Sequence, residues 1–160
     1  MEWRLFLLIR PKINVIVSNF PQSLTVAGYY KNLARIGHYV DQVLAQANLD
    51  DRAAYAVHMA VDEACTNIIK HAYGGEGRGS INISYRIRPD GLQFTIYDHS
   101  DTDFDINHVP QLDTTAPLEK RQSGGMGVFF IHQLMDRVEY QSGTSRGNKL
   151  TLFKRRNPTL

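Results

Sequence analysis

Two short segments of alternating residues, joined by a tight turn, constrain the fold most strongly. Apolar and polar side chains alternate along residues 80–88 and again along residues 92–98. Pro89, Asp90 and Gly91 separate the two segments. These residue types favour tight turns because proline fixes one backbone angle and glycine reaches angles closed to other residues. A period of two is typical of strands, so the pattern predicts a β-hairpin.

Helical spacing of apolar residues marks the region before this hairpin. From Ser23 to Ala47 the pattern predicts one amphipathic helix. A second helix is predicted to begin after Asp50, whose carboxylate can accept hydrogen bonds from the first free N–H groups. It is predicted to end at the Gly74–Gly75 pair. Residues 13–17 are β-branched and alternate, which predicts a first strand.

The second half of the chain predicts a long loop followed by a helix and another hairpin. Residues 99–124 contain acidic, proline and polar residues without a sustained period, and a loop of that length in a small domain is usually functional. Residues 125–135 predict a helix, and residues 137–141 with 148–154 predict the closing hairpin. This order predicts an α+β fold, a two-layer sandwich with helices on one face of a mixed sheet.

Composition narrows the class of protein. A chain of 160 residues suits a single domain, which we expect at residues 13–156, with an extension at 1–12 and a tail at 157–160. Lys and Arg number 18 against 16 Asp and Glu, so net charge indicates neither nucleic acid nor a membrane as partner. The single cysteine, Cys65, excludes an intramolecular disulfide and fits a cytoplasmic protein. The apolar stretch at residues 3–10 is too short to span a bilayer.

Three polar residues share one side of the second predicted helix. Glu63, Asn67 and His71 are spaced by four, so at about 100° per residue they lie one above another. A carboxylate and a carboxamide one turn apart can together orient a Mg²⁺ ion and its water, and Glu63 could accept a proton from an attacking hydroxyl. Lys70 is close enough to reach a phosphate. The same spacing also fits the solvated face of an amphipathic helix.

The surrounding sequence favours the site over the solvated face. A predicted strand ends in Asp98, and Gly124, Gly125 and Gly127 lead into the third predicted helix. Glycines at a helix N-terminus let backbone N–H groups approach a phosphate, and the helix dipole favours an anion there. Taken alone, these glycines favour a flexible junction between loop and helix.

Four segments together resemble the four motifs of the GHKL (histidine-kinase-like) ATPase superfamily, and the closest likeness is to bacterial anti-sigma-factor serine/threonine-protein kinases. They read VDEACTNIIKHAYGG, IYDHSDTDFD, GGMGVFFIHQLMDRVEY and GNKLTLFKR. The resemblance extends from about Ile13 to the last predicted strand. It implies the Bergerat-type ATP-binding fold, with ATP and Mg²⁺ as cofactors.

The resemblance also implies roles for residues of the first motif. Glu63 corresponds to the catalytic general base and Asn67 to the asparagine that ligates Mg²⁺. Lys70 and His71 fall where residues that contact the phosphates and nucleotide lie.

Further roles follow for the other three motifs. Asp98 corresponds to the aspartate that accepts a hydrogen bond from the adenine amino group. Gly125, Met126 and Gly127 correspond to the loop on the phosphate side. Residues 99–123 correspond to the lid over the nucleotide, and Thr151 to a threonine that supports the aspartate. One departure follows Asp98, where the family commonly has a glycine two residues later and this chain has Ser100.

The expected function is phosphoryl transfer from ATP to a serine or threonine of an anti-anti-sigma-type partner, by a homodimer that also binds a sigma factor. The alternative is an ATP-binding module that sequesters a partner with little or no phosphotransfer. The detached ATPase domain of a sensor histidine kinase is disfavoured because no paired-helix segment with a phosphoacceptor histidine precedes the domain. Asp101, Asp103 and Asp105 lack the glycine and terminal glutamate of a calcium loop.

Overall fold

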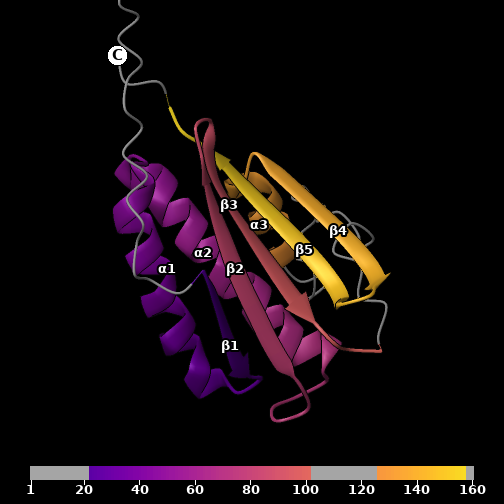
Figure 1. Ribbon diagram of the computed structural model, residues 1–160. Helices are drawn as coiled ribbons and strands as arrows, with labels where there is room; N and C mark the ends of the chain where they lie inside the picture. The colour runs from indigo at the N-terminus through magenta and orange to yellow at the C-terminus, as the bar shows by residue number, and fades with distance from the viewer. Residues whose placement is uncertain (1–21, 102–125, 158–160) are drawn as a thin grey trace, which may run out of the picture.

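A five-stranded sheet forms one layer of the protein and the helices form the other (Figure 1). The computed structural model describes residues 22–101 and 126–157. The order of the strands in the sheet is β1-β2-β3-β5-β4. Their bounds are β1 Ser23–Ala27, β2 Ser80–Arg88, β3 Gly91–Asp98, β4 Arg137–Thr144 and β5 Gly147–Arg155.

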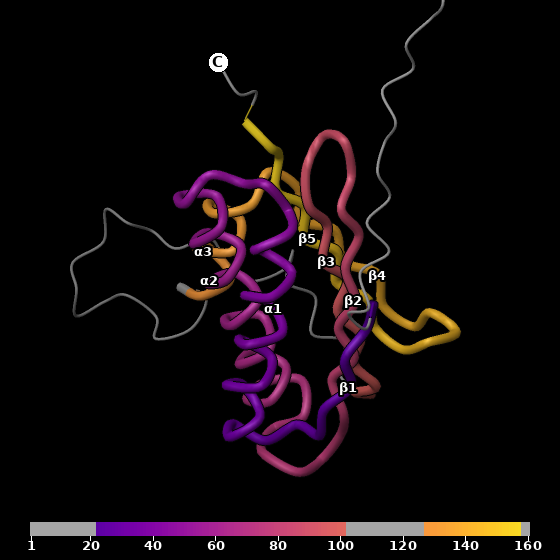
Figure 2. The backbone as a smooth tube through the Cα atoms, turned by 60° about the vertical axis from the view of Figure 1, so that its left-hand side comes forward, coloured from indigo at the N-terminus to yellow at the C-terminus, as the bar shows by residue number. Residues whose placement is uncertain are grey.

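Helices cover one face of this sheet, as the views in Figures 1 and 2 both show. They are a short 3₁₀ turn at Tyr30–Asn32, α1 at Leu33–Ala47, α2 at Asp51–Asn67 and α3 at Met126–Leu134. A π-helical turn, Ile68–Ala72, continues directly from α2. The two-layer α+β class is therefore confirmed. Among the described helices, none is both long and apolar enough to cross a membrane.

The two predicted hairpins and the third predicted helix are confirmed. In the first hairpin β2 and β3 pair with Ile83 opposite Ile96 and Arg88 opposite Gly91, so only Pro89 and Asp90 stand in the turn. Alternation sends one set of side chains toward the helices. These buried strand residues, which pack against buried residues of α1 and α2, include Ile81, Ile83, Leu92, Phe94, Ile96 and Leu152.

The prediction of one helix over Ser23–Ala47 is wrong for its first part. Residues Ser23–Ala27 form β1, which pairs antiparallel with β2, and α1 begins only at Leu33. Leu24 and Ala27 fit the spacing of a helix, whereas Leu24 and Val26 fit that of a strand. Pairing with β2 decides for the strand, because it satisfies the backbone groups of a segment that ends at Gly28. The Gly28 N–H donates to the Gly79 carbonyl oxygen at 2.8 Å.

The expectation of a mixed sheet is also wrong for the described strands, because all four pairings among them are antiparallel. Two of these pairings are hairpins, which can only be antiparallel. The strand predicted at residues 13–17 lies outside the described residues. So does most of the loop predicted at residues 99–124.

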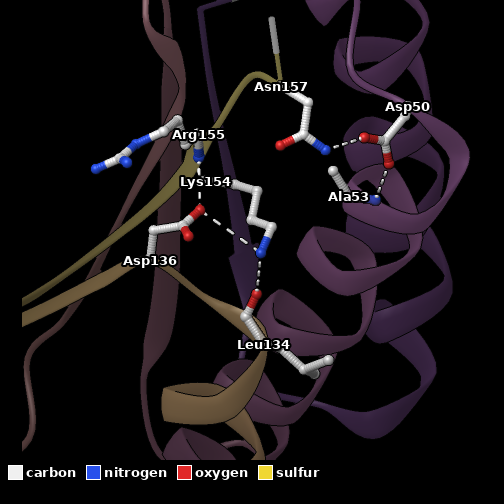
Figure 3. Close-up of polar contacts among 7 residues, drawn as sticks. All are labelled: Asp50, Ala53, Leu134, Asp136, Lys154, Arg155 and Asn157. Atoms are coloured by element: carbon white, nitrogen blue, oxygen red, sulfur yellow. Dashed lines mark hydrogen bonds and ion pairs between the residues drawn. The ribbon is translucent and has the colours of Figure 1, made fainter.

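The predicted cap at the start of α2 is confirmed. Asp50 has an extended backbone and its Oδ1 accepts a hydrogen bond from the Ala53 N–H at 2.7 Å (Figure 3). The other carboxylate oxygen accepts from Asn157 Nδ2 at 2.5 Å. The end of the chain's last described segment is thereby joined to the start of α2.

A second set of contacts joins β5 to the end of α3. Lys154 Nζ donates to the Leu134 carbonyl oxygen at 2.7 Å and lies 3.5 Å from Asp136 Oδ2 (Figure 3). The same carboxylate oxygen accepts from the Arg155 N–H at 2.7 Å. The start of α2 and the end of α3 lie near each other (Figure 3), and both are therefore held against the end of β5 by polar contacts as well as by the core.

Replacing Asp50 by alanine should lower the melting temperature at neutral pH, because α2 loses its N-cap. The Ala53 N–H, and then Asn157, hold the pKa of Asp50 below its ordinary value. A lowered folded-state pKa contributes stability above the unfolded pKa, and that contribution is lost as pH falls through the folded pKa. The melting temperatures of wild type and Asp50→Ala should thus differ most near pH 7, and the difference should shrink as pH falls below about 4. Asp50→Asn keeps an acceptor and should melt near wild type; an equally large loss there would contradict capping.

Candidate functional site

Two of the predicted site residues lie together on the last two turns of α2. Glu63 is half-buried, and Asn67, one turn later, is buried with 9 % of its surface exposed. Asn67 Nδ2 is buried without a hydrogen-bond partner among the described residues. Burying an amide without a partner costs free energy. The position therefore suits a ligand that brings oxygen atoms to this carboxamide.

The third residue of the predicted set, His71, does not lie on the regular α-helix. The α-helical bonding of α2 stops at Asn67, and the Tyr73 N–H then donates to the Ile68 carbonyl oxygen, five residues back, at 2.8 Å. His71 and Lys70 lie in this π-helical turn, and both are exposed. Single π-helical turns occur often at functional sites. The structure thus separates two exposed residues from the more buried pair, and their predicted contacts to a nucleotide stay predictions.

The first turn of α3 lies against Glu63. A Cβ atom added at Gly127 would overlap the Glu63 carboxylate, so a larger residue there would push this carboxylate away. A carboxylate near a helix N-terminus is stabilised by the helix dipole, and the free N–H groups of the same turn can bind an anion. Met126 is the first residue of α3, whereas Gly125 lies outside the described residues. The glycine predicted on the phosphate side therefore lies beside the predicted base.

A second polar cluster forms where β3 ends and β5 begins. Asp98 is buried, and its Oδ1 accepts hydrogen bonds from the Ser100 N–H at 2.9 Å, Ser100 Oγ at 2.6 Å and Asn148 Nδ2 at 3.1 Å. Asn148 Nδ2 also lies 3.1 Å from the Ser100 carbonyl oxygen. Three donors on one oxygen fix the orientation of the carboxylate. Among the described residues, no donor is directed at the other oxygen, Oδ2, which leaves it as an acceptor for a ligand.

The prediction that Thr151 supports Asp98 is wrong. Asp98 is paired with Asn148 across the sheet, whereas Thr151 is paired with Thr95. Neighbouring residues of a strand point to opposite faces, so Asn148 faces the helices with Asp98 and Thr151 faces away. The residue that supports Asp98 is Asn148, which sequence reasoning missed. Counting by two from the buried Leu150 and Leu152 would have found it.

Gly147 makes the pairing of Asp98 with Asn148 possible. Its φ of +96° is favourable only for glycine, and a Cβ atom there would overlap the Asp98 carbonyl oxygen. The two strands can therefore approach closely at the point where their polar ends meet.

Tyr73 connects the two clusters. It follows the π-helical turn and is buried, with its hydroxyl donating to the Ser80 carbonyl oxygen at 2.6 Å. The same hydroxyl accepts from the His99 N–H, next to Asp98, at 3.1 Å. Burial is the main cause that raises the pKa of Tyr73 above its ordinary value, so the hydroxyl keeps its proton for this bond. The end of the helix that carries Asn67 is thereby tied to the end of the strand that carries Asp98.

The arrangement has the parts that a nucleoside triphosphate requires. One end offers a fixed carboxylate oxygen, and the other offers a carboxamide, a carboxylate and a helix N-terminus. The buried carboxamide without a partner, one helical turn from the Glu63 carboxylate, fits a Mg²⁺-bound phosphate group. A cavity of about 480 Å³ beside Lys154 lies at the opposite end of β5 and is lined by none of these residues.

Comparison with known proteins agrees with this geometry. Residues 27–154 match the histidine kinase-like ATPase domain family, so the class that the fold and the site define is the GHKL type of ATP-binding domain. Over 122 residues the chain is 33 % identical to the serine-protein kinase RsbW of Listeria monocytogenes serovar 1/2a, covering 72 % of this chain and 76 % of that protein. It is 32 % identical over 105 residues to the RsbW of Halalkalibacterium halodurans, 63 % of each chain.

A shorter match, 38 % identical over 85 residues, is to the RsbW of Oceanobacillus iheyensis and covers 51 % of this chain and 53 % of that protein. The chain therefore belongs to the family of anti-sigma-factor serine-protein kinases that includes RsbW. The predicted family and the predicted enzyme class, a protein serine/threonine kinase, are both confirmed.

Replacing Asn148 by alanine should destabilise the protein by about 1–3 kcal/mol, because buried Asp98 and Ser100 lose a shared donor. Thr151→Ala is the matched control on the same strand. It lies on the face away from the helices, and its effect should stay within about 0.5 kcal/mol. Urea denaturation followed by circular dichroism measures both. A larger loss for Thr151→Ala than for Asn148→Ala would restore the threonine to the role predicted from the sequence.

Proposed function

We propose that this kinase binds ATP with Mg²⁺ between the end of α2, the start of α3 and the Asp98 cluster, and phosphorylates a serine or threonine of an anti-anti-sigma-type protein. The observation that carries this proposal is the contact of Gly127 with the Glu63 carboxylate. It brings a potential base and an anion-binding helix end to one place, which is what transfer of a phosphoryl group needs.

Asn67 is the residue proposed to hold the metal. Its carboxamide is buried and has both an oxygen that can ligate Mg²⁺ and an amide group that can donate to a phosphate oxygen. When bound, Mg²⁺ neutralises charge on the phosphates and orients them. The free N–H groups of the first turn of α3 are proposed to bind those phosphates. Lys70 and His71 are exposed on the adjoining π-helical turn and are proposed to reach them from outside.

Asp98 is the residue proposed to select adenine. With Oδ1 occupied by Ser100 and Asn148, the remaining oxygen can accept a hydrogen bond from the adenine amino group. A carboxylate only accepts, so guanine, which carries a carbonyl oxygen at that position, would place two acceptors against each other. The three donors orient Asp98 for this contact before the ligand arrives.

Glu63 is proposed to act as the general base. Its half-buried carboxylate can accept the proton of the attacking hydroxyl while the hydroxyl oxygen forms the new bond to phosphorus. The bond between the γ-phosphorus and the bridging oxygen breaks, and this oxygen leaves with the electron pair as part of ADP. The partner, an anti-anti-sigma-type protein, and a sigma factor bound by the same kinase are carried over from the family, as are the homodimer and the cytoplasm as its site of action.

A second function, sequestering a partner with little phosphotransfer, is favoured by one observation. Ser100 stands where the family commonly has glycine, and its hydroxyl donates to Asp98. Because of that bond, the Asp98 carboxylate already has a hydrogen-bond partner within the protein. It therefore gains less from binding a nucleotide.

Glu63→Ala separates the two functions. Phosphotransfer to an anti-anti-sigma-type protein, measured with radiolabelled ATP, should fall by about 10²–10⁴-fold without a base. Asp62→Ala removes an exposed carboxylate from the neighbouring position and should leave the rate near wild type. Equal rates for wild type and Glu63→Ala would remove Glu63 from the role. Stable partner binding without transfer by wild type would establish sequestration instead.

A further inference from the structure

The face of the sheet that is turned away from the helices, here called the outer face, carries charge of mainly one sign. The strand register shows which side chains lie on the outer face. On β3 these are Gln93, Thr95 and Tyr97, which alternate with the residues that face the helices. The neighbours of these three on the other strands also face outward. The cationic residues of this face, including one in the turn before β5, are Arg86, Arg88, Arg137, Arg146, Lys149 and Arg155.

Four of these arginines lie in two neighbouring cross-strand rows, and two of them contact the Phe153 ring. Arg86 and Arg137 lie in the same cross-strand row as Phe153, and Arg88 and Arg155 lie in the next row. The guanidinium carbons of Arg88 and Arg137 lie 5.5 and 5.4 Å from the centre of the Phe153 ring. Stacking on an aromatic ring holds a guanidinium in place while leaving its N–H groups at the edge free to bind.

Carboxylates on the outer face are too few to neutralise these cations. Glu139 lies 3.9 Å from Arg137, and Asp90 in the adjoining turn lies 3.0 Å from Arg88. Within residues 22–101 and 126–157, no ion pair is made by Arg86 or Arg155, and both are exposed. The chain as a whole is nearly balanced, with 18 basic and 16 acidic residues, so the imbalance is local to this face.

The aromatic residues of the outer face are not available for stacking by bases. Phe153 is only 5 % exposed, and Arg146 lies 4.7 Å from the centre of the Tyr97 ring. Proteins that bind single-stranded nucleic acid on a sheet stack bases on open rings. A second copy of the chain would bring like charges together. The ligands that best fit these arginines are therefore carboxylates, which guanidinium groups bind through paired hydrogen bonds.

We infer that the outer face docks an acidic surface of a partner protein, with Arg86, Arg88, Arg137 and Arg155 as its centre. This face lies on the opposite side of the sheet from Glu63, Asn67 and Asp98, so a partner held there leaves the nucleotide site open. The inference is independent of the proposed phosphotransfer, since neither the rate of transfer nor the affinity for ATP enters it.

The test uses the full chain and a fluorescein-labelled decapeptide of glutamate as the probe. Fluorescence anisotropy at low salt should show binding to wild type. The dissociation constant should rise about tenfold or more for the double variant Arg86→Glu with Arg155→Glu, since attraction becomes repulsion. The matched control, Lys31→Glu with Arg35→Glu, makes the same change of net charge at exposed positions beside and on α1 and should change it far less. Arg86→Gln with Arg155→Gln should fall between wild type and the charge reversal.

Three results would overturn the inference. Equal loss in the outer-face and control variants would show that the peptide responds only to net charge. Tighter binding of a ten-nucleotide single-stranded DNA, with the same sensitivity to Arg86 and Arg155, would assign the face to nucleic acid. Self-association of wild type in sedimentation experiments, abolished by the glutamine variant, would assign it to a second copy. The glutamine variant also decides the matter if the charge reversal does not fold.

Discussion

The hydroxyl of Tyr73 is the contact on which the site depends, because it bonds to both ends of the sheet's first hairpin at once. It donates to the carbonyl of Ser80, where β2 begins, and accepts from the N–H of His99, where β3 has ended. Gly28 and Gly79 make room for its ring, since a Cβ atom at either would press on it. Together with the core, this bond holds the helix end that carries Asn67 at a fixed place relative to the strand end that carries Asp98.

Two glycines allow the other close contacts around Glu63 and Asp98. Gly127 and Gly147 each allow an approach that a side chain would prevent, one bringing the first turn of α3 to Glu63 and the other bringing β5 to Asp98. Asn148 and Ser100 then fix the orientation of the Asp98 carboxylate. The serine that departs from the family pattern is thus part of the support for Asp98, because its hydroxyl donates one hydrogen bond that a glycine could not make.

The sequence was sufficient to predict those features that depend on residues close together in the chain. The cap at Asp50 and the turn at Pro89–Asp90 depend on residues within a few positions, and both were found. β1 was missed because Leu24 and Ala27 fit a helical stripe, and the pairing that decides for a strand is with β2, more than fifty positions away. Thr151 was assigned from its likeness to the family's threonine. Strand register, fixed by pairing with a residue fifty positions away, instead brings Asn148 to Asp98.

We propose above all that the buried carboxamide of Asn67 holds Mg²⁺ for a bound ATP. The most direct test of this proposal is calorimetric titration of ATP into wild type and Asn67→Ala, each with Mg²⁺ and with a chelator. Saturable binding by wild type that weakens about tenfold or more without Mg²⁺, and loss of that dependence in Asn67→Ala, is the predicted result. Binding whose Mg²⁺ dependence is the same in both proteins, or no saturable binding by wild type, would contradict it.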